Sequence, residues 1–214
     1  MKTACKSCIL TYVVFFFLYF FSTLGYADHV EVYMNPTLGL AVSGPPEWYM
    51  EMKDNPSSQA KFAFENHPAL FVLFSKYDFK NIANWPNPFG SVILVYVFPP
   101  VNASAMTLLD NHYNKSISPA LRVIELPHEV KLNNQLWAVM VGKKVSTSQG
   151  ITLYQVTYFT LYANGIVQIE AAITEKDYPQ YRKLLDQFVS QIIFDSNKDS
   201  LMSKVMLMRE KNNK

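Results

Sequence analysis

Histidines are the first candidates for chemistry, because an imidazole can bind a metal ion or transfer a proton near neutral pH. No two of them have the H-x-x-x-H or H-E-x-x-H spacing that places metal ligands on one helix face. The seven glycines form neither G-x-G-x-x-G nor G-x-x-x-x-G-K, the loops that hold nucleotide phosphates. We therefore expect neither a metal ion nor a cofactor. The four histidines are His29, His67, His112 and His128.

The sequence gives no more support to a catalytic nucleophile or acid than to a metal or cofactor site. Val42-Ser43-Gly44-Pro45 lacks the first glycine of the G-x-S-x-G nucleophile elbow and runs into prolines. Glu170 interrupts an apolar run, but alternation places it beside Gln168 on one strand face, which favours a solvated surface. A hydrolase with dispersed acidic residues stays open, since distant carboxylates can meet in a fold. The expectation is a protein that is not an enzyme.

Five aromatic residues are the candidate binding residues. Tyr154, Tyr158 and Tyr162 share the parity of one β-prone run, so they line one strand face that could stack a sugar or base. Tyrosine is also common in half-buried sheets that bind nothing. Trp85 and Phe89 lie in the segment 75–90, whose prolines and lack of periodicity predict a long loop. These aromatics suit a protein contact, or they plug one end of the sheet.

Residues 1–27 have the three parts of a secretory signal peptide. Lys2 and Lys6 precede an apolar run over 9–21, and Gly25 and Ala27 are small residues before a cleavage site. Cleavage would start the mature chain at Asp28 and would remove both cysteines, and with them any thiol nucleophile or disulfide. The alternative is an uncleaved anchor, because the apolar stretch is nearly long enough to span a bilayer. Both interpretations export the body, to the periplasm or beyond.

The mature chain has the size of a single domain, predicted over 28–195. Residues 196–214 are polar and form either a tail or a short helix. Loss of the signal lowers the basic residues from 19 to 17, which equals the 17 acidic residues. A neutral chain lacks the basic surface that binds phosphates, so nucleic acid is not an expected partner. No membrane anchor is expected after cleavage.

Short β-prone runs separated by turn residues recur along the mature chain. Asn133-Asn134 suits a tight turn, and Asn164-Gly165 between two β-rich runs is a strong hairpin signal. The segment 57–66 has no clear periodicity and receives no assignment. The predicted strands are 29–34, 39–43, 48–52, 69–74, 91–98, 122–125, 129–132, 135–145, 151–162 and 166–173.

Two segments carry apolar residues at helical spacing. The first, 103–114, follows Asn102, a residue type that caps helix N-termini. The second runs from Glu175 to about Gln191, behind a Thr174 and Asp177 pair that resembles a capping box. Hairpins dominate, so we predict an α+β fold in which a mainly antiparallel sheet packs against a few helices. The apolar stripe of the second helix is Tyr178, Tyr181, Leu185, Phe188 and Ile192.

The order of elements resembles the PsbP-like fold, which photosystem extrinsic subunits, a Ran-binding nuclear import factor and many exported bacterial proteins share. The resemblance covers most of the mature chain. Its motifs are the run 38–43 leading into Pro46-Glu47-Trp48, the Asn164-Gly165 hairpin, and the closing helix that continues through 188–194. The resemblance implies a binding or assembly role, since this fold is known mostly for docking to other proteins. It implies no site residues.

Three functions therefore stand in order. The first is an exported, non-enzymatic protein that binds another protein or stabilises an assembly, through the segment that contains Trp85 and Phe89. The second is a small-ligand or carbohydrate binder that uses the tyrosine face or the same loop. The third is the hydrolase with dispersed acidic residues. The oligomeric state does not follow from the sequence.

Overall fold

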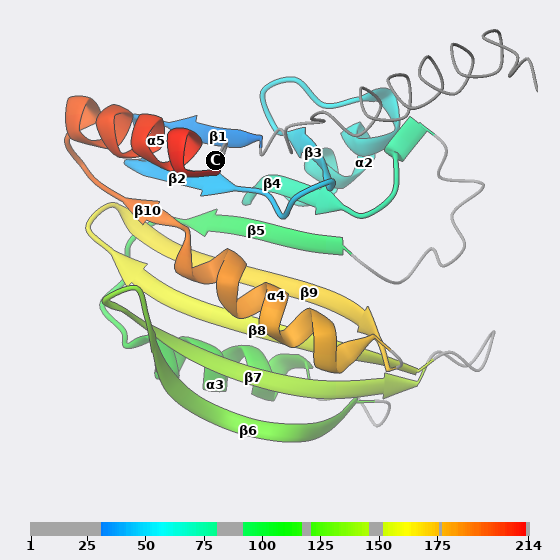
Figure 1. The fold of residues 1–214 in the computed structure, drawn as a ribbon. Helices are drawn as coiled ribbons and strands as arrows, with labels where there is room; N and C mark the ends of the chain where they lie inside the picture. Colours follow the sequence, from blue (N-terminus) through cyan, green and yellow to red (C-terminus); the bar gives the residue numbers. More distant parts are fainter. Residues whose placement is uncertain (1–30, 81–91, 117–120, 146–151, 176, 213–214) are drawn as a thin grey trace, which may run out of the picture.

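The computed structural model describes residues 31–80, 92–116, 121–145, 152–175 and 177–212. Its strands form a three-stranded sheet, β1-β2-β10, and a seven-stranded sheet, β3-β4-β5-β9-β8-β7-β6 (Figure 1). All neighbouring strands pair antiparallel, so the predicted α+β class is confirmed. The strands are β1 (Val32–Asn35), β2 (Leu40–Ser43), β3 (Tyr49–Met52), β4 (Leu70–Ser75), β5 (Val92–Phe98), β6 (Leu121–Leu132), β7 (Gln135–Val145), β8 (Thr152–Tyr162), β9 (Gly165–Thr174) and β10 (Ile193–Phe194). The helices are α2 (Ser58–Asn66), α3 (Ala105–Ser116), α4 (Tyr178–Ser190) and α5 (Lys198–Asn212).

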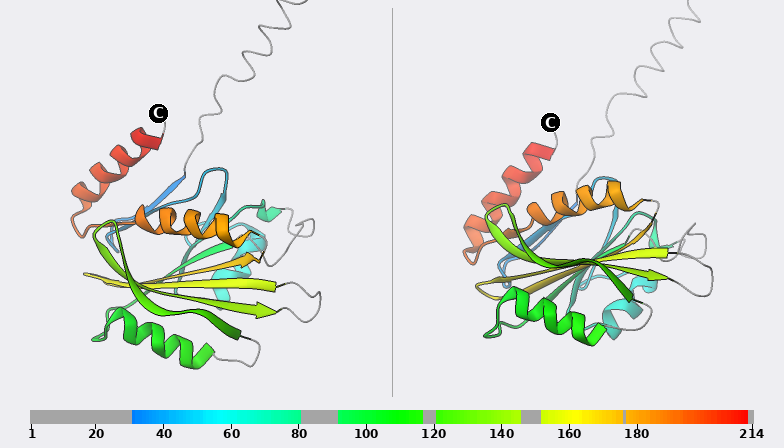
Figure 2. Two further views of the ribbon diagram at one scale, coloured as in Figure 1. Left: turned by 60° about the horizontal axis from the view of Figure 1, so that its bottom comes forward. Right: turned by 90° about the horizontal axis from the view of Figure 1, so that it is seen from below.

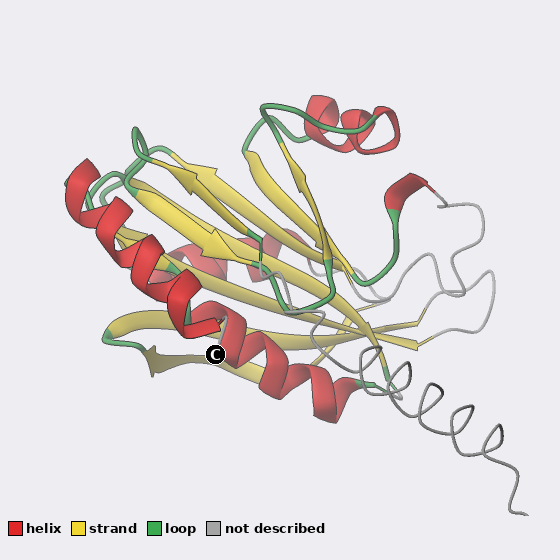
Figure 3. Ribbon diagram, turned by 45° about the horizontal axis from the view of Figure 1, so that its top comes forward, coloured by secondary structure: helices red, strands yellow, loops and turns green. Residues whose placement is uncertain are grey.

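The elements stack in layers around the seven-stranded sheet. One face of this sheet packs against α4 and the three-stranded sheet, and the opposite face packs against α2 and α3 (Figure 2). Helix α5 lies on the outer side of the three-stranded sheet, beside β1 and β2 (Figure 3). Leu201 and Val205 of α5 are buried there against Ala41. The segment after Asp195 is therefore a packed helix.

The main core lies between α4 and the large sheet. Alternate residues of β9, Val167, Ile169, Ala171 and Ile173, point to this side, as expected for a strand with period two. Leu185 and Phe188, which the helical stripe placed in the core, are 0% and 3% exposed, so this prediction is confirmed.

Helix α4 begins three residues later than predicted. Asp177 is its N-cap residue but makes no capping hydrogen bond with its side chain, and proline occupies the first turn. The Thr174 hydroxyl donates to the Asp177 carboxylate, whereas in a capping box its oxygen would accept from a helix N–H. The predicted capping box is therefore wrong: the pair closes the turn between β9 and α4.

The helices on the other face show two further differences from prediction. The unassigned segment is helix α2, in which Ser57 caps the Ala60 N–H, and Ala60 and Phe64 are buried one turn apart. Helix α3 is capped by Ser104, whose Oγ accepts from Thr107 N, and not by Asn102. The helix at this position is confirmed, but its cap is two residues later.

Two hairpins end near each other at one end of the sheet. Asn133 and Asn134 have φ values of 46° and 64°, the left-handed pair that a type I′ turn requires. In the other hairpin Gly165 serves close packing, since a Cβ there would lie 2.3 Å from the Phe98 carbonyl oxygen. β6 is one strand with register shifts beside Glu125, where two separate strands were predicted.

Candidate functional site

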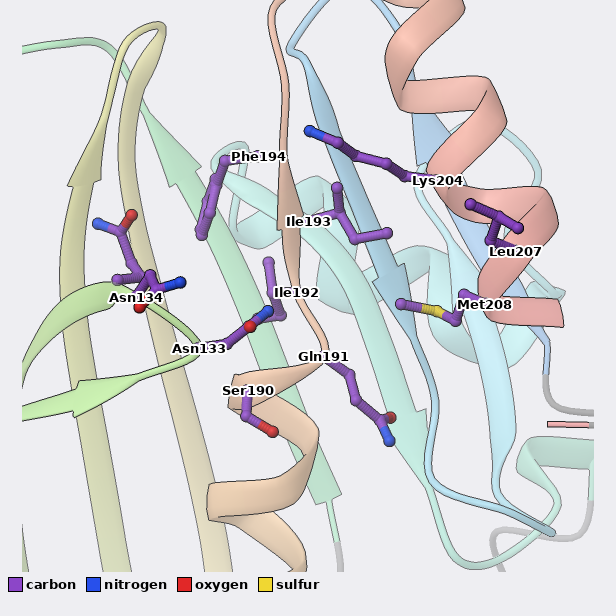
Figure 4. A pocket seen from close by; sticks show the side chains of 11 residues that line it. Asn133, Asn134, Ser190, Gln191, Ile192, Ile193, Phe194, Lys204, Leu207 and Met208 are labelled. Atoms are coloured by element: carbon purple, nitrogen blue, oxygen red, sulfur yellow. The ribbon is translucent and has the colours of Figure 1, made fainter. Parts of the chain in front are cut away.

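A groove of about 950 Å³ lies at this end of the fold, between α5 on one side and the β6–β7 hairpin on the other (Figure 4). The connection from α4 through β10 forms its floor. Three stretches that are distant in the sequence meet here because the closing strand β10 joins the three-stranded sheet. The lining residues are Asn133, Asn134, Gln135, Ser190, Gln191, Ile192, Ile193, Phe194, Lys204, Leu207 and Met208.

β10 presents an open edge to this groove. Its outer position follows from the strand order, in which it has β2 on one side only. Asp195 N donates to the Gly39 carbonyl at 2.8 Å, and Phe194 pairs with Leu40. In this register Phe194 and Leu40 form a non-hydrogen-bonded pair, so the N–H and C=O of Phe194 point away from β2. Such an edge can pair with another extended chain.

The walls of the groove combine amide and apolar side chains. Asn133 and Asn134 reach in from the type I′ turn, and Gln191 lies at the end of α4 (Figure 4). Leu207 and Met208 of α5 form the opposite wall, and Leu207 is 65% exposed. Amide groups can pair with a peptide backbone, and the apolar wall can cover side chains. The lining suits an uncharged extended segment.

The charge of the lining is balanced within the protein. Lys204 Nζ lies 2.5 Å from Asp195 Oδ2, and Asp195 also accepts from the Ser200 hydroxyl and the Asn197 N–H. The hydrogen bonds from Lys204 and Ser200 lower the pKa of Asp195 to about 2. The pair ties the start of α5 to the end of β10. The charge of Lys204 is thereby paired with that of Asp195, so Lys204 is not a free cation in the groove.

The groove continues past Phe194 toward the β8–β9 hairpin. A further hollow of about 390 Å³ shares Gln135, Phe194 and Lys204 with the first and includes Tyr162 and Asn164. Asn164 Nδ2 donates to the Leu38 carbonyl, which fixes this hairpin against the three-stranded sheet. Phe194 therefore lies at the junction of the two hollows.

Of the five candidate residues from the sequence, the structure describes the three tyrosines. Trp85 and Phe89 lie outside the described residues. Tyr154, Tyr158 and Tyr162 do share one face of β8, but this face packs against α4 and β10. Tyr154 stacks on Tyr178 of α4 with ring centroids 4.4 Å apart.

Tyr158 is the most enclosed of the three tyrosines. It is 0% exposed, and its hydroxyl donates to Asp186 of α4 at 2.7 Å. Burial, which the nearby Arg182 charge partly offsets, raises the pKa of Tyr158 well above its usual range. Its ring offers no surface to a ligand while α4 is in place. Of the three tyrosines, Tyr162 alone borders the groove, in the hollow beyond Phe194.

Glu170 is less exposed to solvent than the alternation of residues along its strand predicted. Its side chain is 20% exposed, 3.6 Å from His112 Nε2 of α3, and it accepts a hydrogen bond from Gln168. Burial, followed by the charge of Glu170, raises the pKa of the neighbouring Tyr96 to about 12. The pair joins α3 to the sheet. Within the described part of the chain no three metal-ligating side chains gather at one place.

Sequence reasoning missed the groove because no local spacing connects its parts. Phe194 follows the last predicted helix and reads as the end of an apolar run. Leu207 and Met208 lie in the segment that was predicted as either a tail or a helix. The predicted tight turns at Asn133-Asn134 and Asn164-Gly165 were the signals that pointed to this end of the molecule.

Comparison of the structure with solved structures identifies the fold. The solution structure of cyanobacterial PsbP (CyanoP) from Synechocystis aligns with a TM-score of 0.52 and 11% identity, over 81% of this chain and 96% of that chain. The chain has a PsbP-like fold. The resemblance expected from the sequence is thereby confirmed at the level of the fold. At this identity the alignment shows the PsbP-like fold and carries no site residues over.

Two further solved structures align less well. LpqN, involved in cell envelope biogenesis of Mycobacterium tuberculosis, aligns with a TM-score of 0.49 and 11% identity, over 78% of this chain and 86% of that chain. The Ran-binding protein Mog1p of Saccharomyces cerevisiae aligns with a TM-score of 0.45 and 10% identity, over 81% and 98%. No protein-family model and no curated protein matches the sequence. Among the described residues, no helix has the length and apolar character needed to cross a bilayer.

Proposed function

We propose that this protein is exported and acts without catalysis, by binding an extended segment of another protein in the groove between β10, α5 and the β6–β7 hairpin. Export rests on the signal-peptide pattern of residues 1–27. The PsbP-like fold supports a docking role. The observation that carries the proposal is the open edge of β10, which lies between an amide wall and an apolar wall.

The binding mode follows from these three parts. A segment that lies along β10 can pair with the N–H and C=O of Phe194, as peptides do at other sheet edges. Asn133 and Gln191 can donate to and accept from its remaining backbone groups. Leu207 and Met208 cover its apolar side chains. The single charged lining residue is already paired, so charge adds little to the affinity.

A peptide selection tests the proposal directly. The mature chain, residues 28–214, selects binders from a displayed library of unstructured heptapeptides, and isothermal titration calorimetry measures the enriched sequences. Leu207→Glu places a charge in the apolar wall, so we expect it to lower the affinity for these peptides by about tenfold or more.

Met206→Glu is the matched control, because it changes the next residue of the same helix to the same side chain. Met206 is 64% exposed, close to Leu207, but does not line the groove. We expect this variant to bind as the unmodified protein does. If no peptide is enriched, or if both variants bind equally well, the proposed function is wrong.

A further inference from the structure

Two buried hydrogen-bond donors next to Phe194 lack a partner among the residues that the structure describes. Within the described part of the chain, neither Trp137 Nε1 nor the Tyr162 hydroxyl has a hydrogen-bond partner, although both atoms are shielded from solvent. Trp137 is 0% exposed, and its indole nitrogen can only donate. Buried polar groups are normally paired, because an unpaired one costs free energy. Two unpaired donors close to one groove suggest that an acceptor arrives with a ligand.

Phe194 separates these donors from the groove. Its ring centroid lies 5.0 Å from that of Tyr162 and 6.1 Å from that of Trp137. In Figure 4 the Phe194 ring points away from α5, whereas Ile193 points toward it. The Phe194 ring packs against the side chains of Tyr162 and Trp137, and β10, which carries it, has only two residues and pairs with β2 alone. Turning it aside would open a path from the groove to both donors.

We propose that a bound segment displaces the Phe194 ring and places a neutral carbonyl group against Trp137 Nε1 and the Tyr162 hydroxyl. The subsite then selects a side chain that combines an apolar body with a carbonyl oxygen, such as a carboxamide. This inference rests on the proposed function for the segment that delivers the carbonyl. The carbonyl subsite itself, defined by Trp137, Tyr162 and Phe194, can be probed with a small molecule.

The charges around the subsite favour a neutral ligand group. A carboxylate would leave water without gaining a cation, because Lys204 is already paired with Asp195, the residue that follows Phe194. An ammonium group could donate to the Tyr162 hydroxyl, but it would face the Trp137 N–H, which can only donate. Burial raises the pKa of Tyr162, so its hydroxyl keeps the proton that it donates at neutral pH. A carbonyl oxygen fits both constraints.

Benzamide is the probe, because its ring can replace that of Phe194 between the two aromatic residues and its carbonyl can accept from both donors. The mature protein is titrated with benzamide, and the indole N–H signal of Trp137 is followed by ¹H–¹⁵N NMR. We expect this signal to move downfield and saturate. Benzoate has the same shape with a charge, and we expect it to bind at least tenfold more weakly.

Tyr162→Phe tests the second donor without changing the ring. It removes a hydroxyl that has no hydrogen-bond partner among the described residues, so the melting temperature should stay the same or rise. We expect benzamide affinity to fall about five- to tenfold, the effect of one hydrogen bond. Tyr154→Phe, on the same face of β8 but stacked on α4, is the matched control and should bind benzamide normally.

Several results would overturn the carbonyl subsite. They are an unmoved Trp137 signal, equal binding of benzoate, unchanged binding by Tyr162→Phe, or a fall in its melting temperature, which would mean that ordered water pairs the hydroxyl. The proposed function fails separately. If peptide binding is weakened by Leu207→Glu but not by Tyr162→Phe, the carbonyl subsite alone is contradicted. If benzamide binds but no peptide is selected, the peptide groove alone is contradicted.

Discussion

Arg182 joins α4 to the edge of the large sheet through several contacts at once. Its Nη1 lies 2.6 Å from Glu125 of β6, and its Nε lies 3.4 Å from Asp186 one turn along α4. Asp186 in turn accepts from Tyr158. Burial works against the guanidinium charge, but the acidic neighbours and Tyr158 outweigh it and raise the pKa of Arg182. The network orients α4 over the tyrosine face and closes that face to ligands.

Asp195 provides a pH-dependent contact at the same residue scale. Its pKa falls from the usual 3.8 to about 2, mainly because Lys204 and Ser200 donate to it. A carboxylate whose pKa is lowered by folding stabilises the fold at pH values above its pKa in the unfolded chain. This contribution disappears as the pH falls through its pKa in the folded protein. We predict that the stability advantage of the native chain over Asp195→Asn is full near pH 5 and disappears between pH 4 and pH 2.

Urea titrations at several pH values measure this difference. Lys204→Met should remove much of the same stability advantage, since the hydrogen bond from Lys204 is the largest cause of the lowered pKa of Asp195. Glu65→Gln is the control, because the side chain of Glu65 is 62% exposed and its i,i+4 pair with Lys61 is worth little. An advantage that persists unchanged down to pH 2 would contradict the assignment of the effect to Asp195.

At the scale of elements, alternation and turn residues were enough to predict most strands. β2, β4, β5 and β7–β9 appear within a residue or two of their expected bounds, because each buries at least one face. β6 was divided since Pro127 interrupts its pattern, and the strand absorbs the proline through register shifts at the sheet edge. α2 was missed because Phe62 is exposed and only Ala60 and Phe64 mark its buried side.

The packing of helix α4 on the sheet gives a prediction about stability. Phe188 is 3% exposed and meets Phe74 of β4 edge to face, with ring centroids 5.4 Å apart. Phe188→Ala leaves a cavity between α4 and the sheet, and we expect it to cost about 3 to 5 kcal/mol of unfolding free energy. Denaturant titration of the mature chain measures this loss. Gln187→Ala, at an exposed neighbouring position, should change stability by less than ~0.5 kcal/mol.

The groove could not be predicted from single elements. Its floor and walls come from a hairpin turn, the end of α4, β10 and α5, and the sequence between these parts carries no common period. Only the return of the chain at β10 to pair with β2, near the other end of the described chain, brings them together. Gly39 permits this return, because its φ is +64° and a Cβ would lie 2.7 Å from the Asp195 carbonyl oxygen.

At the scale of the whole molecule, the three-stranded sheet closes the fold over the large sheet. β1 and β2 supply two strands, and β10 adds the third after α4 has crossed the main core. Leu40 and Val42 of β2 point into that core, while Ala41 contacts α5 on the outside. The first part of the described chain is therefore needed for both the core and the groove.

The proposed export predicts where the mature chain begins. β1 starts at Val32, so a chain that starts at Asp28 keeps every described strand and the pairing of β1 with β2. We predict that the exported protein has the intact mass of residues 28–214 and melts at the same temperature as that segment produced directly. Ala27→Leu replaces the small residue next to the cut and should leave the signal attached, whereas Tyr26→Leu should be processed normally. Retention of Met1 on the unmodified exported protein would contradict cleavage and favour the membrane anchor.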